Sequence, residues 1–95
     1  MSKLFQDTQY ASEMFKALSN KDRLVILSGL LKGEMKVGEM ESVFGIQQPT
    51  LSQQLARLRS ARLVKTRRVS KEIFYSLASV DAKLMLEWLS GNSKR

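Results

Sequence analysis

The chain contains no cysteine and no histidine among its 95 residues. Without cysteine it can form no disulfide and can bind no metal through a thiolate. Without histidine it lacks the commonest acid, base and metal ligand of neutral pH. Phosphate-binding glycine loops and nucleophile motifs are absent as well. We therefore expect no metal, no cofactor and no enzymatic activity.

Long apolar runs are also missing. No run approaches the roughly eighteen residues that a membrane span requires, and the first residues, MSKLFQDTQY, contain no apolar block of signal-peptide length. We expect a cytoplasmic protein that does not bind membranes. The length and an apolar fraction of 43% fit a single domain over residues 1–95. Because such a domain has a small core, a second copy is expected to cover any remaining apolar helix faces.

Acidic residues are absent from positions 42–71, between Glu41 and Glu72. The seven basic residues of this segment account for the whole formal charge of +7, since the rest of the chain holds nine basic and nine acidic residues. Most charge runs are only solvated surfaces. This run overlaps a helix suited to DNA, so together they indicate a polyanionic partner. The seven are Arg57, Arg59, Arg62, Lys65, Arg67, Arg68 and Lys71.

The only proline, Pro49, lies in the most informative stretch, GIQQPTLSQQLARL. Gly45 can end one helix in the left-handed conformation, and Pro49 suits the first position of the next. We expect that next helix at residues 48–61. Its three leucines repeat at helical spacing and form an apolar back, whereas its front is amide-bearing, hydroxylated or cationic. The leucines are Leu51, Leu55 and Leu58, and the front consists of Thr50, Ser52, Gln53, Ala56, Arg57 and Ser60.

Helical apolar patterns flank this stretch on both sides. They predict a helix over residues 4–18, a buried second helix that is capped by Ser19 or Asn20 and ends at Gly33, and a third over residues 37–44. A last helix is expected after Ser79 and before Gly91.

Residues 63–68 and 72–77 are rich in β-branched and aromatic side chains, with a short polar link between them. They predict a two-stranded hairpin whose tip carries Arg67, Arg68, Ser70 and Lys71. The fold class is therefore mainly α, a homodimeric winged helix-turn-helix with about five helices and a hairpin wing. The dimer interface is expected on the first and last helices, although core packing within one subunit is an alternative for each residue. The residues are Phe5, Met14, Phe15, Leu84, Trp88 and Leu89.

Four motifs occur in an order that resembles the ArsR/SmtB family of winged-helix repressors: FKALSNKDRL, VGEM, QPTLSQQL and IFYSL. QPTLSQQL and TRRVSKEIFYSL look most like the branch of the biofilm growth-associated repressor, which is close to the HlyU-type regulators. The resemblance implies a dimeric repressor that binds a palindromic promoter operator. Members of the family commonly release DNA when a metal binds or when two cysteines are linked.

The residues of that sensing chemistry differ in this chain. The redox branch carries a cysteine at the position of Ser28, and the segment 87–95 offers only Ser90 and Ser93 where its partner would lie. Asp81 and Glu87 have no histidine to complete an interfacial metal site. A hydroxyl cannot replace a thiolate in either role at neutral pH. We therefore expect thiol and metal sensing to be absent.

The resemblance and the helical wheel together predict the residues that contact double-stranded DNA. Gln53 is the best candidate for a base edge, and Gln54 turns towards the core side. Two alternatives stay open: a HlyU-like antirepressor that competes for promoter DNA, and a sequence-indifferent nucleic-acid-binding protein. Bases or adjacent phosphates are assigned to Gln47, Gln48, Thr50, Ser52, Gln53 and Gln54, phosphates to Arg57 and Arg59, and flanking backbone or minor groove to Arg67, Arg68, Ser70 and Lys71.

Overall fold

The computed structural model describes residues 7–92. This part of the chain forms five helices and a small antiparallel sheet, so the predicted winged helix-turn-helix fold is confirmed. The elements are α2 (Thr8–Leu18), α3 (Lys21–Leu30), β1 (Met35–Lys36), α4 (Val37–Phe44), α5 (Thr50–Ser60), β2 (Val64–Val69), β3 (Glu72–Leu77) and α6 (Val80–Asn92).

Short polar side chains start three of the helices, because they bond to backbone N–H groups that have no partner within the helix. Asn20 Oδ1 accepts from the Arg23 backbone N–H at 3.0 Å, and Ser79 Oγ accepts from that of Ala82 at 3.1 Å, as predicted. Asp7 caps α2 in a non-helical conformation. The helix α2 therefore begins at Thr8, and the predicted helical positions 4–6 lie outside the described residues.

Of the three glycines predicted to follow a helix, only Gly45 directly follows one. Gly45 follows α4 in the left-handed conformation, at φ 68°, as predicted. Gly33, by contrast, lies in the turn after α3, which ends at Leu30. Gly91 does not follow the last helix but lies within α6. Pro49 precedes α5 as its N-cap and is not its first residue.

The sheet has three strands in the order β1, β3, β2, whereas the sequence predicted only the two-stranded hairpin. The missing strand is β1, whose two residues pair with Tyr75 and Phe74 of β3. Two residues are too few to display an alternating pattern, so sequence periodicity cannot reveal such a strand. Its effect is to attach the wing to the segment between α3 and α4.

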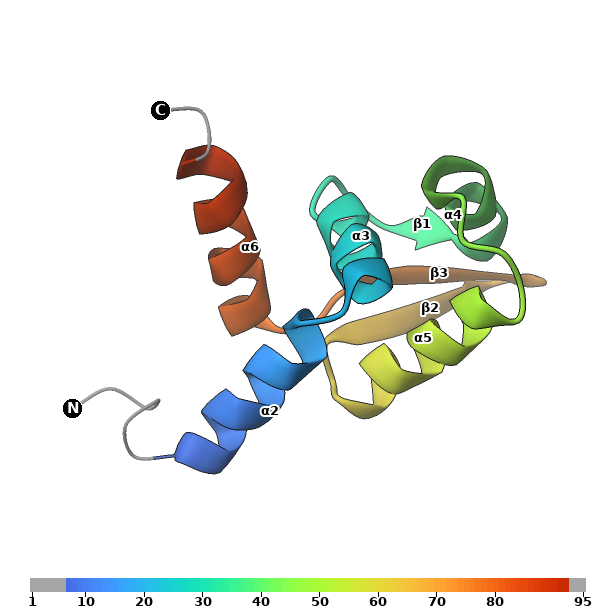
Figure 1. The fold of residues 1–95 in the computed structure, drawn as a ribbon. Coiled ribbons are helices and arrows are strands. Elements are labelled where there is room, and N and C mark those ends of the chain that lie inside the picture. Colours follow the sequence, from blue (N-terminus) through green and yellow to red (C-terminus); the bar gives the residue numbers. More distant parts are fainter. Residues whose placement is uncertain (1–6, 93–95) are drawn as a thin grey trace.

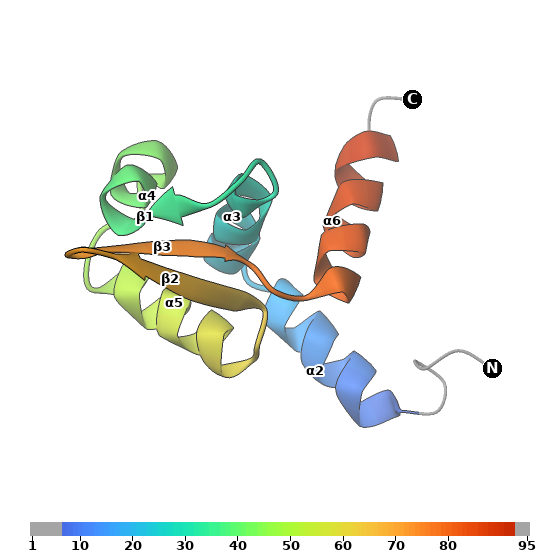
Figure 2. The ribbon, with the colours of Figure 1, turned by 180° about the vertical axis from the view of Figure 1, so that it is seen from behind.

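The core lies where α3, α4 and α5 meet the sheet. Ile26 and Leu27 of α3, Met40 of α4 and Leu51 and Leu58 of α5 are fully buried there. The helices α2 and α6 extend from the end of the molecule opposite the hairpin turn (Figure 1; Figure 2). In the described part of the chain, no helix is long and apolar enough to cross a membrane.

Gly29 is a close approach point in this core. A Cβ atom on Gly29 would lie 2.3 Å from Cζ of Phe44, so α3 and α4 could not keep their present contact. We expect Gly29→Ala to lower the free energy of unfolding by about 1–3 kcal/mol, the usual cost of overpacking. Urea unfolding followed by circular dichroism measures this change.

The matched control is Gly38→Ala, because a Cβ atom on Gly38 in α4 would meet nothing within 4 Å. Alanine is the better helix former, so this variant should be neutral or more stable by up to about 1 kcal/mol. Equal stability of the two variants would mean that the α3–α4 contact is not close at Gly29.

Candidate nucleic-acid interface

The helix α5 buries one side and exposes the other. Leu51, Leu55 and Leu58 are at most 2% exposed and pack into the core. Their burial orients α5 about its axis, because side chains three and four positions apart share one side of a helix. The positions between them, at about 100° per residue, then face away from the core. The exposed side consists of Thr50, Ser52, Gln53, Ala56, Arg57, Arg59 and Ser60, and Gln47 is exposed just before the helix.

Gln48 is exposed but is engaged with neighbouring groups at both ends of its amide. Its Oε1 accepts from the backbone N–H and the hydroxyl of Ser52, at 3.0 and 2.7 Å, and its Nε2 donates to Glu41 at 3.0 Å. Pro49, the N-cap, makes no side-chain cap bond. Gln48 therefore caps the first turn of α5 in place of the N-cap residue.

Gln54 is the one residue of the predicted set that lies away from this surface. Its side chain is only 7% exposed and bonds to Arg23 and Asn20 within the protein. Gln54 comes three positions after Leu51 and four before Leu58, so its side chain points to the same buried side of α5. Gln54 cannot reach a DNA base from the exposed side of α5.

The hairpin formed by β2 and β3 carries the predicted cationic tip. Arg68, Ser70 and Lys71 are exposed there, and Arg68 Nε donates to the carbonyl of Ser70 at 3.3 Å. Ser70 takes the left-handed conformation, at φ 58°, which a tight hairpin turn requires. These three side chains are therefore available to an anionic partner.

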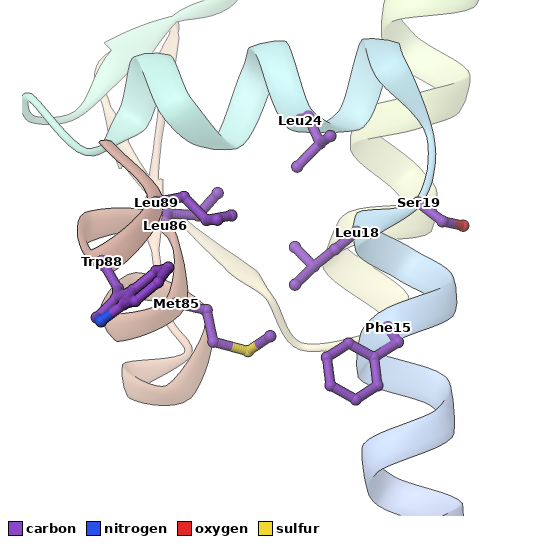
Figure 3. A pocket seen from close by; sticks show the side chains of 8 residues that line it. All are labelled: Phe15, Leu18, Ser19, Leu24, Met85, Leu86, Trp88 and Leu89. Carbon is purple, nitrogen blue, oxygen red and sulfur yellow. The ribbon is translucent and has the colours of Figure 1, made fainter. Parts of the chain in front are cut away.

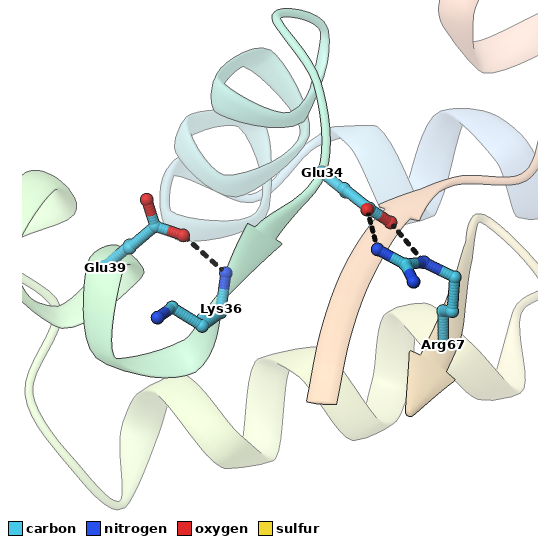
Figure 4. Close-up of polar contacts among 4 residues, drawn as sticks. All are labelled: Glu34, Lys36, Glu39 and Arg67. Atoms are coloured by element: carbon cyan, nitrogen blue, oxygen red, sulfur yellow. Dashed lines mark hydrogen bonds and ion pairs between the residues drawn. The ribbon is translucent and has the colours of Figure 1, made fainter. Parts of the chain in front are cut away.

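Arg67 differs from the other tip residues because it is held by the protein. Its guanidinium donates two hydrogen bonds to the carboxylate of Glu34, and its Cζ lies 5.0 Å from the centroid of the Phe74 ring (Figure 4). The hydrogen bond from Arg67 lowers the pKa of Glu34 below its ordinary value. Arg67 thus anchors the wing to the segment before β1.

A second set of contacts connects Lys36 of β1 to β3 and to α4. Lys36 Nζ lies 2.9 Å from the Glu72 carboxylate. The Lys36 backbone N–H donates to Glu39 at 2.9 Å (Figure 4). The hydrogen bond to Glu72 raises the pKa of Lys36. Sequence reasoning missed Glu34, Lys36 and Glu72 as wing supports, because their pairing depends on the unpredicted strand β1.

A hollow of about 420 Å³ is bordered by α5 and the wing sheet. Ser52, Arg59 and Ser60 line it from the helix, and Tyr75 lines it from β3. Hydroxyl groups and a guanidinium group are the donors that bind phosphate oxygens. Sequence reasoning missed Tyr75, because only the packing of the sheet against α5 brings it to this surface.

All seven basic residues of the segment 42–71 are exposed. They lie on α5, on the wing and on the link between them, so the positive charge is carried by these consecutive elements. In the part of the chain described, no group of three or more acidic side chains could bind a metal ion.

A separate apolar surface lies between α2, α3 and α6. A groove of about 450 Å³ is lined there by Phe15, Leu18, Leu24, Met85, Trp88 and Leu89 (Figure 3). Phe15, Leu84, Trp88 and Leu89 are 55 to 60% exposed. Tyr10 of α2 also donates a hydrogen bond to Asp81 of α6, which raises the pKa of the Tyr10 hydroxyl.

Two further residues, Met14 and Phe5, were predicted for a dimer interface. Met14 is 7% exposed and belongs to the core of its own subunit. Consecutive side chains on a helix point about 100° apart, so Met14 can be buried while Phe15 is exposed. Phe5 lies outside the described residues.

Residues 20–66 match the model of the bacterial regulatory protein family named arsR. The chain is 47% identical over 76 residues to the biofilm growth-associated repressor of Agrobacterium fabrum, a match that covers 80% of this chain and 65% of that protein. It is 39% identical over 89 residues to the transcriptional activator HlyU of Vibrio cholerae, with 94% of this chain and 82% of that protein covered. This chain belongs to the ArsR family.

Solved structures of family members have the same fold. The structure of HlyU from Vibrio cholerae matches with a TM-score of 0.87 over the whole of both chains, at 39% identity. The repressor BigR from Xylella fastidiosa matches equally well, with a TM-score of 0.87, 39% identity and coverage of 96% of this chain and 95% of that one. ArsR-family proteins are DNA-binding transcriptional regulators and not enzymes. The resemblance inferred from the motifs is thus confirmed.

The ion pair between Glu34 and Arg67 requires the ionised carboxylate of Glu34, so its contribution depends on pH. Because the pKa of Glu34 is lowered in the folded state, its contribution is complete above the ordinary carboxyl range and is lost as the pH falls through the lowered pKa. We expect Arg67→Gln to return the pKa of Glu34 to its ordinary value. A carbon-13 NMR titration of the Glu34 carboxyl measures it.

Arg68→Gln is the control, since Arg68 bonds to Ser70 and not to Glu34. The pKa of Glu34 should stay low in this variant. If Arg67→Gln left the pKa unchanged, the carboxylate would not be paired with Arg67 in solution.

Proposed function

We propose that this protein is a homodimeric repressor that binds a palindromic operator in promoter DNA. The observation that carries the proposal is the exposed side of α5, which has amides, hydroxyls and arginines but no acid and lies beside a cationic hairpin. A helix of this kind fits the major groove, where amides read base edges, while a basic wing contacts the flanking backbone. The names of a similar repressor and a similar activator support the general role.

The roles of the individual residues follow from their positions. Base edges are read by Gln53, Gln47 and Thr50. Gln53 is the main base reader, because it is exposed in the first half of α5. Arg57 and Arg59 bind phosphates, with Ser52 and Tyr75 beside Arg59 in the hollow under the wing. Arg68, Ser70 and Lys71 reach the neighbouring backbone or minor groove. Gln48 and Arg67 contribute by holding α5 and the wing in place, and Gln54 is not a DNA contact.

The second copy binds at the groove between α2, α3 and α6. Large apolar side chains such as Phe15, Trp88 and Leu89 are more than half exposed there, an arrangement typical of association surfaces. A two-fold dimer would present two α5 helices about one DNA turn, roughly 34 Å, apart. Such a dimer reads a palindrome, because each half-site meets the same surface.

An antirepressor is the second candidate, and the similarity to an activator favours it. It would bind the same promoter and displace another regulator. A reporter gene under the bound promoter separates the two, since deletion of a repressor raises expression and deletion of an antirepressor lowers it. In both cases we infer that release from DNA uses no thiol chemistry, because the chain contains no cysteine.

Sequence-indifferent binding of single strands is less well supported. Such proteins stack bases on exposed aromatic rings. The rings within or beside the basic segment are Phe44, Phe74 and Tyr75, and each is half-buried. Competition between duplex promoter DNA and a single-stranded oligonucleotide tests this alternative.

Replacement of Gln53 by alanine should remove base reading without removing charge. We expect Gln53→Ala to weaken binding to the DNA upstream of its own gene by about 1–3 kcal/mol and to change binding to shuffled duplex little. Fluorescence anisotropy with both duplexes measures the difference. The matched variant Arg68→Ala should weaken binding to both and reduce the salt slope by about one phosphate per wing.

Equal losses of Gln53→Ala on the two duplexes would remove Gln53 as a base reader. An unchanged salt slope in Arg68→Ala would remove Arg68 from the contacts with phosphate.

The apolar groove gives a test of the dimer. Leu89→Lys places a charge on a side chain that is 57% exposed at the groove, and we expect it to raise the dimer dissociation constant by tenfold or more, about 1.4 kcal/mol or above. Light scattering during gel filtration measures the mass. The control is Val43→Lys, because Val43 is 69% exposed on α4 and lies outside the groove.

The wild type and Val43→Lys should both elute as dimers, and Leu89→Lys as a monomer at the same concentration. A Leu89→Lys protein that remained dimeric would place the interface elsewhere.

A further inference from the structure

A buried hydrogen-bond network connects α5 to the junction between α2 and α3. At its centre is Gln54, the only buried polar side chain among the described residues. Its Oε1 accepts from Nη1 of Arg23 at 3.2 Å, and its Nε2 donates to Oδ1 of Asn20 at 3.4 Å. Both partners belong to the start of α3, so the network crosses from one helix to another.

Arg23 extends the network to the end of α2. Its Nε donates to the carbonyl of Ala17 at 2.8 Å and its Nη2 to that of Lys16 at 3.2 Å. Carbonyls in the last turn of a helix have no partner within it and carry the negative end of the helix dipole. The guanidinium is therefore fixed to α2 by charge and by two bonds, while its third nitrogen reaches Gln54.

The same junction borders the apolar groove. Leu18, Ser19 and Leu24 line the groove, and they come from the same segment, residues 17–24, as the network residues Ala17, Asn20 and Arg23. The network thus lies between the surface proposed for dimerisation and the helix proposed for DNA reading.

Packing alone would permit an apolar side chain at position 54. Leucines occupy the neighbouring buried positions 51, 55 and 58, and replacing a buried polar group by an apolar one is often neutral. Hydrogen bonds restrict the relative orientation of two helices, because their distances and angles are satisfied in only one placement. Apolar contacts tolerate small shifts and rotations of one helix against the other.

We propose that Gln54 is a positioning residue that fixes the orientation of α5 relative to α2 through Arg23. It touches no DNA. Its consequence for DNA reading rests on the proposed function, since α2 belongs to the dimer surface and the dimer sets the separation of the two α5 helices.

The test measures the placement of α5 directly within one chain. Because the chain has no cysteine, Ser12→Cys on α2 and Ala56→Cys on α5 give two unique sites, both exposed, for spin labels. Labelled protein is mixed with excess unlabelled protein, so that double electron–electron resonance reports only the distance within a chain. We expect a narrow distribution in the otherwise wild-type protein and a loss of that single narrow peak in Gln54→Leu.

Two variants control for the loss of an amide in general. Gln54→Glu keeps an acceptor for Arg23 and should retain the narrow peak. Gln53→Leu removes the adjacent, exposed amide and should also retain it. Gln54→Leu itself should fold, because Arg23 keeps both α2 carbonyls and Asn20 still accepts from the Arg23 backbone N–H.

Binding to the DNA upstream of its own gene provides the second readout. If α5 takes the reading orientation about a tenth of the time in Gln54→Leu, its affinity falls about tenfold with an unchanged salt slope. A narrow peak in Gln54→Leu, or a broad one in the wild type, would overturn the positioning role. A wild type with a narrow peak but no preference for its upstream DNA would instead contradict the proposed function.

Discussion

The burial of three leucines along one side of α5 is the constraint on which the rest of the structure depends. Leu51, Leu55 and Leu58 are in the centre of the core, so a large rotation or withdrawal of α5 would expose them. Burial of each such side chain stabilises by about 1.5–3 kcal/mol, more than any exposed ion pair in the fold. The polar side is exposed as a direct result, and it is the side suited to DNA.

The core sets the approximate orientation of α5 and the wing, and polar contacts define it more precisely. Gln48 caps the start of α5, Gln54 connects its middle to α3, and Arg67 with Glu34 holds the wing beside it. Each contact is weak alone in water, and the exposed pair at Arg67 is further screened by salt. Their value lies in orientation, since the helix and the wing must meet one DNA backbone together.

The helices and the hairpin could be predicted from the sequence because their signals are local. Helical leucine spacing, the caps Asn20 and Ser79 and the left-handed Gly45 each need only a few neighbouring residues. The strand β1 and the pairing of Glu34 with Arg67 could not be predicted, because both join residues more than thirty positions apart. The helical wheel turned Gln54 towards the core side, as the structure has it, but the sequence could not predict its bonds to Arg23 and Asn20, and Gln54 stayed among the predicted DNA contacts.

The most direct measurement of the central claim is hydroxyl-radical footprinting of the wild-type protein on the DNA upstream of its own gene. The account predicts two protected segments of the same sequence, related by a two-fold axis and about one turn of DNA apart, and no such pattern on shuffled duplex. Uniform protection of both duplexes, or a single protected segment, would contradict it.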